Sequence, residues 1–216
     1  MPVLDVSSLL QEAATFALQE SDHREPDLYG VTDGKAVGTY IEQKFRNCLA
    51  DKYTFHLGQS ASGIDFPQLE IDVKTTSIRQ PQSSCPFKSA RQKIYGLGYG
   101  LLIFVYEKSD DHFERTARLD IKHAIFVNAA QTADYQTTRG IRDLLKRDGN
   151  RDDLIAYFQE RNLPVDDVQA NELADDVLRD PPSQGYLTIS NALQWRLQYS
   201  RVIQRANHVK GVHKLR

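Results

Sequence analysis

The fold can be argued from one stretch of the sequence, Ser62-Gly63-Ile64-Asp65-Phe66-Pro67-Gln68-Leu69-Glu70-Ile71-Asp72-Val73-Lys74-Thr75-Thr76. Apolar and charged residues alternate along its second half, which predicts a β-strand with one buried and one charged face. The charged face carries Glu70, Asp72 and Lys74. A glycine and a proline flank Asp65 and indicate a turn that brings Asp65 back beside Asp72. Two carboxylates and an ammonium group would then meet at one point.

Converging carboxylates have a chemical use, because Mg²⁺ prefers oxygen ligands and keeps several of its waters. A metal-bound water is more acidic and therefore a better nucleophile. The Lys74 ammonium could orient that water or offset the charge that develops on a phosphorane. The pattern favours a Mg²⁺-dependent phosphodiesterase acting on nucleic acid, with Mn²⁺ able to substitute. An ordinary strand with a charged solvent face is the alternative, since D-x-K triplets also arise by chance.

The same residues resemble the signature of the PD-(D/E)XK nucleases, the superfamily of most type II restriction endonucleases and many repair nucleases. Asp65 matches the first acid, and Asp72-Val73-Lys74 matches the triplet that ends in lysine, whereas Ile64 replaces the usual proline. The resemblance implies catalytic roles for Asp65, Asp72 and Lys74. It also implies that Asp65, Asp72 and the Val73 carbonyl ligate the metal ion. It covers about residues 35–106, a third of the chain.

Glu42 is a further candidate for the same site. It lies in a predicted helix at residues 35–51, on the flank of an apolar stripe that includes Ile41 and Phe45. The resemblance implies that a glutamate from the helix before the catalytic strands can join the metal site, and Glu42 is the matching position. An ion pair with Arg46, four residues later on the helix, is an equally good interpretation.

Basic residues are segregated along the chain, although its net charge is −2. Residues 73–106 and 181–216 hold five and six basic residues, respectively, and no acid, whereas residues 150–180 hold nine acids against three arginines. One basic face can therefore exist on a slightly acidic protein. The predicted loop 79–86 and helix 87–95 follow the charged strand, and glutamine can read adenine while serine can bind phosphate. The candidate DNA-binding residues are Arg79, Gln82, Ser83, Ser84, Lys88, Arg91, Gln92 and Lys93.

A solvated connection is an equally good interpretation of the loop at 79–86. The predicted C-terminal helix, with its exposed arginines, is a second candidate for DNA contacts. The basic tail at 208–216 is interpreted as a DNA-binding arm, with a disordered end as the alternative. A helix-turn-helix reader at 152–178 is disfavoured because acidic helices are repelled by phosphates.

The chain as a whole predicts an α/β protein with a restriction-endonuclease-like mixed β-sheet core flanked by helices, and with a C-terminal helical layer. Residues 1–130 form the expected catalytic core, and residues 131–216 form a helical appendage with a basic tail, packed on the core as one domain. The expected helices are 7–21, 35–51, 87–95, 135–146, 152–162, 166–178 and 190–207. The expected strands are 53–58, 69–78, 101–106 and 116–127, the last as one strand or two.

Composition limits the class of protein. No apolar run approaches the roughly 20 residues of a membrane span, and the N-terminus lacks the pattern of a signal peptide. Two cysteines do not form a disulfide framework. These features favour a cytoplasmic protein with no membrane partner.

The favoured function is a type II restriction enzyme that cuts a short site in double-stranded DNA. A homodimer is expected because a two-fold axis matches a palindrome, and a cognate DNA methyltransferase is the expected genetic partner. Two alternatives stay open from the sequence. One is a structure-specific repair or recombination nuclease of the same superfamily, and the other is a DNA-binding module without activity.

Overall fold

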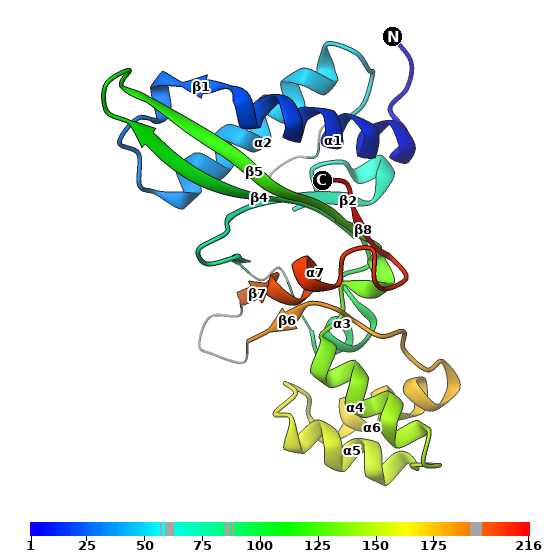
Figure 1. The fold of residues 1–216 in the computed structure, drawn as a ribbon. Helices are drawn as coiled ribbons and strands as arrows, with labels where there is room; N and C mark the ends of the chain where they lie inside the picture. Colours follow the sequence, from blue (N-terminus) through cyan, green and yellow to red (C-terminus); the bar gives the residue numbers. More distant parts are fainter. Residues whose placement is uncertain (57, 59–62, 85–86, 88, 191–195) are drawn as a thin grey trace.

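A curled, mixed β-sheet forms the centre of the protein (Figure 1). The computed structural model describes residues 1–56, 58, 63–84, 87, 89–190 and 196–216. The strand order is β1-β5-β4-β2, with β8 also paired to β5; β2 and β4 run parallel, whereas the other pairs are antiparallel. The strands are β1 Arg24–Glu25, β2 Ile71–Ser77, β4 Gly100–Asp111, β5 Thr116–Val127 and β8 Val212–Lys214. The expected α/β class with a mixed sheet flanked by helices is confirmed.

The apolar run of β4 is explained by burial on both of its faces. Leu102 and Phe104 point into a core beneath the N-terminal helices, while Leu101 and Ile103 point into a second core on the opposite face. All four side chains are fully buried. A strand covered on both sides needs apolar residues at every position, so the alternation seen at solvent-facing strands is absent here.

Two helices cover the first face of the sheet, α1 Val6–Asp22 and α2 Gly34–Ala50 (Figure 1). Each begins at an aspartate whose carboxylate accepts a backbone N–H of the first turn, Asp5 for α1 and Asp33 for α2. The rings of Phe16, Phe45 and Phe104 meet beneath them with centroids 5.2 to 5.6 Å apart. These aromatic contacts fix both helices to the central strand.

The second face of the sheet carries α7 Ser200–Arg205 and a small antiparallel sheet of order β3-β7-β6. Its strands are β3 Gln82–Ser84, β7 Arg196–Gln198 and β6 Thr188–Ile189. Beyond it lies a helical layer, seen in Figure 1 at the end of the molecule opposite α1 and α2. The layer comprises α3 Ala90–Tyr95, α4 Tyr135–Leu145, α5 Arg151–Glu160 and α6 Asp167–Arg179. Elsewhere in the chain, three short 3-10 helices are η1 Pro26–Leu28, η2 Pro67–Leu69 and η3 Ala129–Gln131.

Three expectations near the termini and the first strand are wrong. Residues 53–58 form no strand in their described part, because Thr54 makes an isolated parallel bridge to Val3 instead. Residues 190–207 do not form one long helix, because β7 pairs with β3 and β6 before the short α7 begins. The basic tail is not a free arm: β8 extends the central sheet, and Arg216 donates to the backbone carbonyl of Ala17.

Two smaller expectations also need correction. Leu69 does not start the charged strand, because it ends η2 and is followed by Glu70 in the left-handed region at φ 54°. Helix 87–95 begins only at Ala90, where the Ser89 hydroxyl caps it. The other expected helices lie within two residues of the predicted bounds and β5 matches its prediction, whereas β4 continues to Asp111, well beyond the expected end at residue 106. In the described part of the chain, no helix has both the length and the apolar character that crossing a membrane requires.

Phe104→Ala is expected to destabilise the protein by about 3–5 kcal/mol, since the cavity would open where α1, α2 and β4 meet. The measurement is the free energy of unfolding from urea titration. Phe113→Ala is the matched control, because this ring is 92% exposed and its removal should change the free energy of unfolding by no more than about 0.5 kcal/mol. Equal losses from the two substitutions would contradict the packing described here.

Candidate active site

A tight reversal of the chain places Asp65 beside β2. Phe66 and Ile71 exchange backbone hydrogen bonds of 2.9 and 3.2 Å around η2. The Oδ2 atom of Asp65 then accepts the backbone N–H of Val73 at 2.9 Å. This contact is available because β2 is the edge strand of the sheet and pairs with β4 on its other side. The expected return of Asp65 to the charged strand is present.

Asp72 and Lys74 lie on the same face of β2, two residues apart. The ammonium nitrogen of Lys74 is 2.6 Å from Oδ2 of Asp72. The Asp72 residue is only 2% exposed, and within the described part of the chain its Oδ2 has no hydrogen bond of acceptable alignment despite the short ion pair. Burial, reinforced by the nearby Asp65 carboxyl and opposed by Lys74, raises the pKa of Asp72 to about 7.

Glu42 reaches the same point from α2. Burial raises its pKa, and the charge of Asp65 acts in the same direction, while Lys74 and a hydrogen bond with Thr75 oppose the shift. Arg46 does not turn its guanidinium to the Glu42 carboxylate. It donates Nε to the Glu42 backbone carbonyl at 3.3 Å and lies 3.9 Å from Asp65. The Glu42 carboxyl therefore interacts with the charge of Asp65. Arg46, the ion-pair partner expected for Glu42, pairs with Asp65 instead.

A cavity of about 300 Å³ opens beside these residues. It is bounded by the first half of α2, by β2 and by β3, and its lining is polar. The lining residues are Gly34, Lys35, Gly38, Thr39, Glu42, Lys74, Thr75, Ser83 and Ser84. Two lysines and several hydroxyls around one carboxylate make a suitable environment for a phosphate group. Sequence reasoning missed Lys35 and Thr75, which carry no motif and reach the site through the packing of α2 on β2.

The candidate DNA-binding residues do not share one surface. Ser83 and Ser84 line the cavity, but Gln82 donates its backbone N–H to Thr76 and accepts from the same hydroxyl. Arg79 is exposed and lines another cavity, of about 460 Å³, which shares Gly34 with the first. Lys88 lies outside the described residues.

The two described cations of α3 differ in exposure, because Arg91 is exposed whereas Lys93 is buried. Arg91 forms an ion pair with Asp176 of α6, and Lys93 is 3% exposed. The sequence predicted an exposed outer face of this helix carrying Lys93, and that prediction is wrong, because α3 packs against α4 on the side that carries Lys93. Gln92 is half-buried in the same helix.

The donor set at β2 fits a hard cation. Asp65 and Asp72 supply carboxylate oxygens, and Oδ2 of Asp72 lacks an aligned donor. The carbonyl of Val73 leaves the strand on the same side as its N–H, which points to Asp65. Within the described ranges, no group of three or more acidic, histidine or cysteine side chains has the geometry of a metal site. The two carboxylates and the carbonyl suit Mg²⁺, because this ion retains several waters and needs few protein ligands.

The chain is similar to known restriction enzymes along nearly its whole length. A model of the protein family described as type II restriction enzyme NspV matches residues 3–214. The curated protein named type II restriction enzyme NspV, from Nostoc sp. (strain ATCC 29411 / PCC 7524), is 65% identical over 212 residues. This similarity covers 98% of the chain and 96% of the relative. No solved structure matches the chain.

Asp72→Asn is expected to stabilise the metal-free protein at a pH above 7, because the ionised carboxylate is disfavoured by burial when its pKa is raised to about 7. The gain should be about 1 kcal/mol or more, measured by urea unfolding in EDTA. Mg²⁺ should raise the unfolding free energy of the wild type by mass action and leave that of Asp72→Asn unchanged.

Asp120→Asn is the matched control for this substitution. Its ion pair with Lys122, at 2.7 Å, lowers the pKa of Asp120, so loss of the charge should weaken the fold slightly or leave it unchanged. A stabilisation by Asp120→Asn equal to that of Asp72→Asn, or an equal response of both variants to Mg²⁺, would contradict the assignment.

Proposed function

This chain belongs to the NspV family of type II restriction enzymes and is a site-specific DNA endonuclease, and we propose that its active site is the cluster of Asp65, Asp72 and Lys74. The observation that carries the proposal is the convergence of these residues on the open edge of β2. Enzymes of this class generally need a divalent metal ion. The proposal names Mg²⁺, with Mn²⁺ as a substitute, and assigns the chain to the PD-(D/E)XK superfamily.

Asp65, Asp72 and the Val73 carbonyl are the proposed ligands, and Glu42 stands close enough to contribute through its charge. When bound, the metal ion supplies a water of lowered pKa and a positive charge next to the scissile phosphate. Arg46 holds Asp65 by a contact of 3.9 Å, and the Val73 N–H keeps the Asp65 carboxylate turned to β2. Both contacts preorganise the ligands before DNA arrives.

Lys74 has the proposed role of holding the attacking water and offsetting negative charge on the phosphorus as the bond to water forms. Its ammonium group is a quarter exposed and ion-paired with Asp72, so it lies between the acidic cluster and the adjoining cavity. The hydroxyls of Ser83 and Ser84 and the ammonium of Lys35 line that cavity. They are the proposed contacts to the phosphates that flank the scissile bond.

The proposal extends to partners and organisation. Double-stranded DNA is the substrate, a homodimer would place two active sites on opposite strands of a symmetric site, and a DNA methyltransferase of the same specificity would protect the host. A cytoplasmic location follows from such a role. Residues 1–130 would carry the chemistry, while residues 131–216 would add DNA contacts.

Lys74→Ala is expected to slow cleavage of plasmid DNA on the order of 10²–10³-fold, as for loss of one group that stabilises transition-state charge. Lys52→Ala is the matched control, because Lys52 lies outside the site and forms an ion pair with Glu12 at 2.7 Å. This variant should cut at the wild-type rate. The readout is discrete bands in Mg²⁺ and none in EDTA. Cleavage by Lys74→Ala at the wild-type rate would contradict the proposed role.

A dimer is tested by sedimentation of the purified protein with and without a duplex that carries the cleaved site. The expected mass of the protein component is twice the 24.6 kDa of one chain. A single chain per duplex that still cuts both strands together would exclude the dimer.

A further inference from the structure

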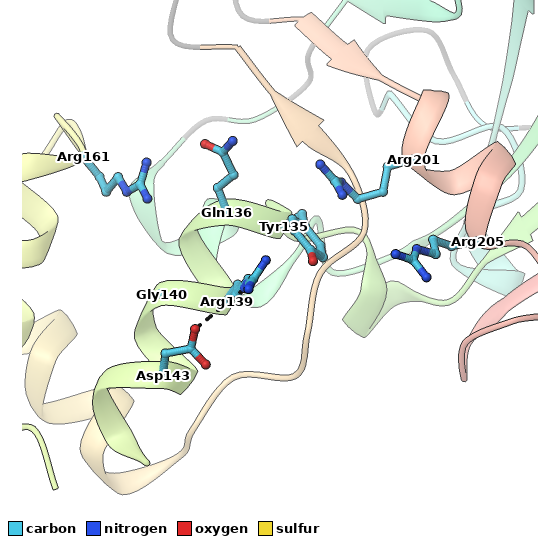
Figure 2. A pocket seen from close by; sticks show the side chains of 8 residues that line it. All are labelled: Tyr135, Gln136, Arg139, Gly140, Asp143, Arg161, Arg201 and Arg205. Atoms are coloured by element: carbon cyan, nitrogen blue, oxygen red, sulfur yellow. Dashed lines mark ion pairs between the residues drawn. The ribbon is translucent and has the colours of Figure 1, made fainter. Parts of the chain in front are cut away.

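Arginines gather in a cavity that is separate from the candidate active site. The cavity has a volume of about 590 Å³ and is called here the arginine pocket. Figure 2 shows α4 at its centre, with Arg161 on one side and Arg201 and Arg205 on the other. The lining residues are Tyr135, Gln136, Arg139, Gly140, Asp143, Arg161, Arg201 and Arg205. Four arginines therefore face one carboxylate.

Arg201 is the best-positioned group of the arginine pocket. Its guanidinium lies 3.8 Å from the centroid of the Tyr135 ring, a stacked arrangement that holds the side chain without neutralising its charge. Its Nε atom is buried and has no hydrogen-bond partner among the residues that the structure describes. A buried donor without a partner is costly, so an acceptor bound beside Arg201 would be favourable.

Helical and aromatic contacts also position the other arginines of the pocket. Arg205 follows Arg201 by four residues on α7, so the two side chains lie on one face of that helix. Arg161 stacks on Tyr157 with 5.3 Å to the ring centroid and donates to its hydroxyl. The single carboxylate, Asp143, is shared between Arg139 at 3.7 Å and Lys146 at 3.9 Å.

The small sheet connects the arginine pocket to the candidate active site. Ser83 of β3 lines the catalytic cavity, and its hydroxyl is 2.5 Å from that of Tyr199, the residue just before α7. At the other edge of this sheet, Leu187 next to β6 accepts the backbone N–H of Tyr135. The sheet has the order β3-β7-β6, so two strand spacings, roughly 10 Å, lie between the strand at the catalytic cavity and the strand next to the arginine pocket.

We propose that the arginine pocket binds a backbone phosphate of the substrate DNA at a position flanking the cleaved bond, with Arg201 and Arg205 as its principal contacts. The stacked guanidinium groups provide forked donors that match phosphate oxygens. The proposal rests on DNA as the substrate, but it does not depend on the metal ligands assigned above. A backbone contact of this kind would strengthen binding to cognate and unrelated sequences alike.

An acidic surface of another protein chain is the competing occupant, because α5 and α6 carry many carboxylates. DNA is favoured because the pocket adjoins, through β3 and β7, the cavity in which the cleaved phosphate is proposed to lie. Several of those carboxylates are also already paired within the chain: Asp175 with Arg151 at 3.0 Å, and Asp176 with Arg91 and Arg179.

The test measures binding of a short fluorescent duplex by anisotropy, in EDTA so that no cleavage occurs, over a series of salt concentrations. The variant Arg201→Gln combined with Arg205→Gln should bind about tenfold more weakly, and the slope of log affinity against log salt should fall by about one to two. The loss should be the same for a duplex with the cleaved site and for one without it.

Arg115→Gln is the matched control, because Arg115 stacks on Tyr29 with 5.2 Å to the centroid but lies at the remote tip of the β4–β5 hairpin. It should keep the wild-type affinity and salt slope. Because Arg201 is partly buried, Arg205→Gln alone is the second variant if the double variant melts early; Arg205 is exposed, and its loss should lower the slope by about one.

Three results would overturn the proposal. The first is an unchanged affinity and salt slope in the folded variants. The second is unchanged DNA binding together with a change of oligomeric mass in sedimentation, which would assign the pocket to a second copy of the chain. The third is a thermal shift of the wild type by ATP or inorganic phosphate that the variants lose while duplex binding stays intact. Because binding is measured in EDTA, the result for the arginine pocket is independent of the Lys74 test, which measures cleavage.

Discussion

The hydrogen bond from the Val73 N–H to the Asp65 carboxylate is the contact on which the proposed active site depends. It can form because β2 is the edge of the central sheet and leaves one row of backbone donors unpaired. The Asp65 carboxylate accepts one of these donors, and this contact brings Asp65 close to Asp72. The same contact that closes the sheet edge thus brings two carboxylates together.

Burial on both sides of β4 sets the position of this edge. Because β4 is enclosed by apolar side chains on both faces, the parallel strand β2 is held in a fixed register from Ile71 to Ser77. The aromatic cluster of Phe16, Phe45 and Phe104 fixes α2 on the first face. Glu42 is carried on that helix, so its approach to Asp65 is determined by the core rather than by local sequence.

Local sequence predicted the parts of the molecule that are governed by local physics. Alternation on β2, the apolar run of β4 and the capped helices were recognisable because period and cap chemistry act over a few residues. The errors have a common cause in tertiary pairing. β7 and β8 pair with distant strands, and Lys93 is buried where α3 packs against α4, which comes much later in the chain. The convergence of Asp65 on Asp72 was predictable, whereas the contributions of Lys35 and Thr75 required the packing of α2.

The distribution of charge follows from the same separation between edge and core. Acids gather where a cation can compensate them, at Asp65 and Asp72, and the burial that raises the pKa of Asp72 makes the metal-free site unfavourable. Arginines gather at the opposite end of the small sheet, where Arg161 and Arg201 stack on tyrosine rings. A net charge of −2 therefore does not exclude a polyanionic substrate. Association with DNA depends on the potential at the contacting face, and each of the two sites has groups that lack full compensation within the chain. Stability given up at such positions is recovered when the ligand binds, which is the general relation between binding sites and the folds that hold them.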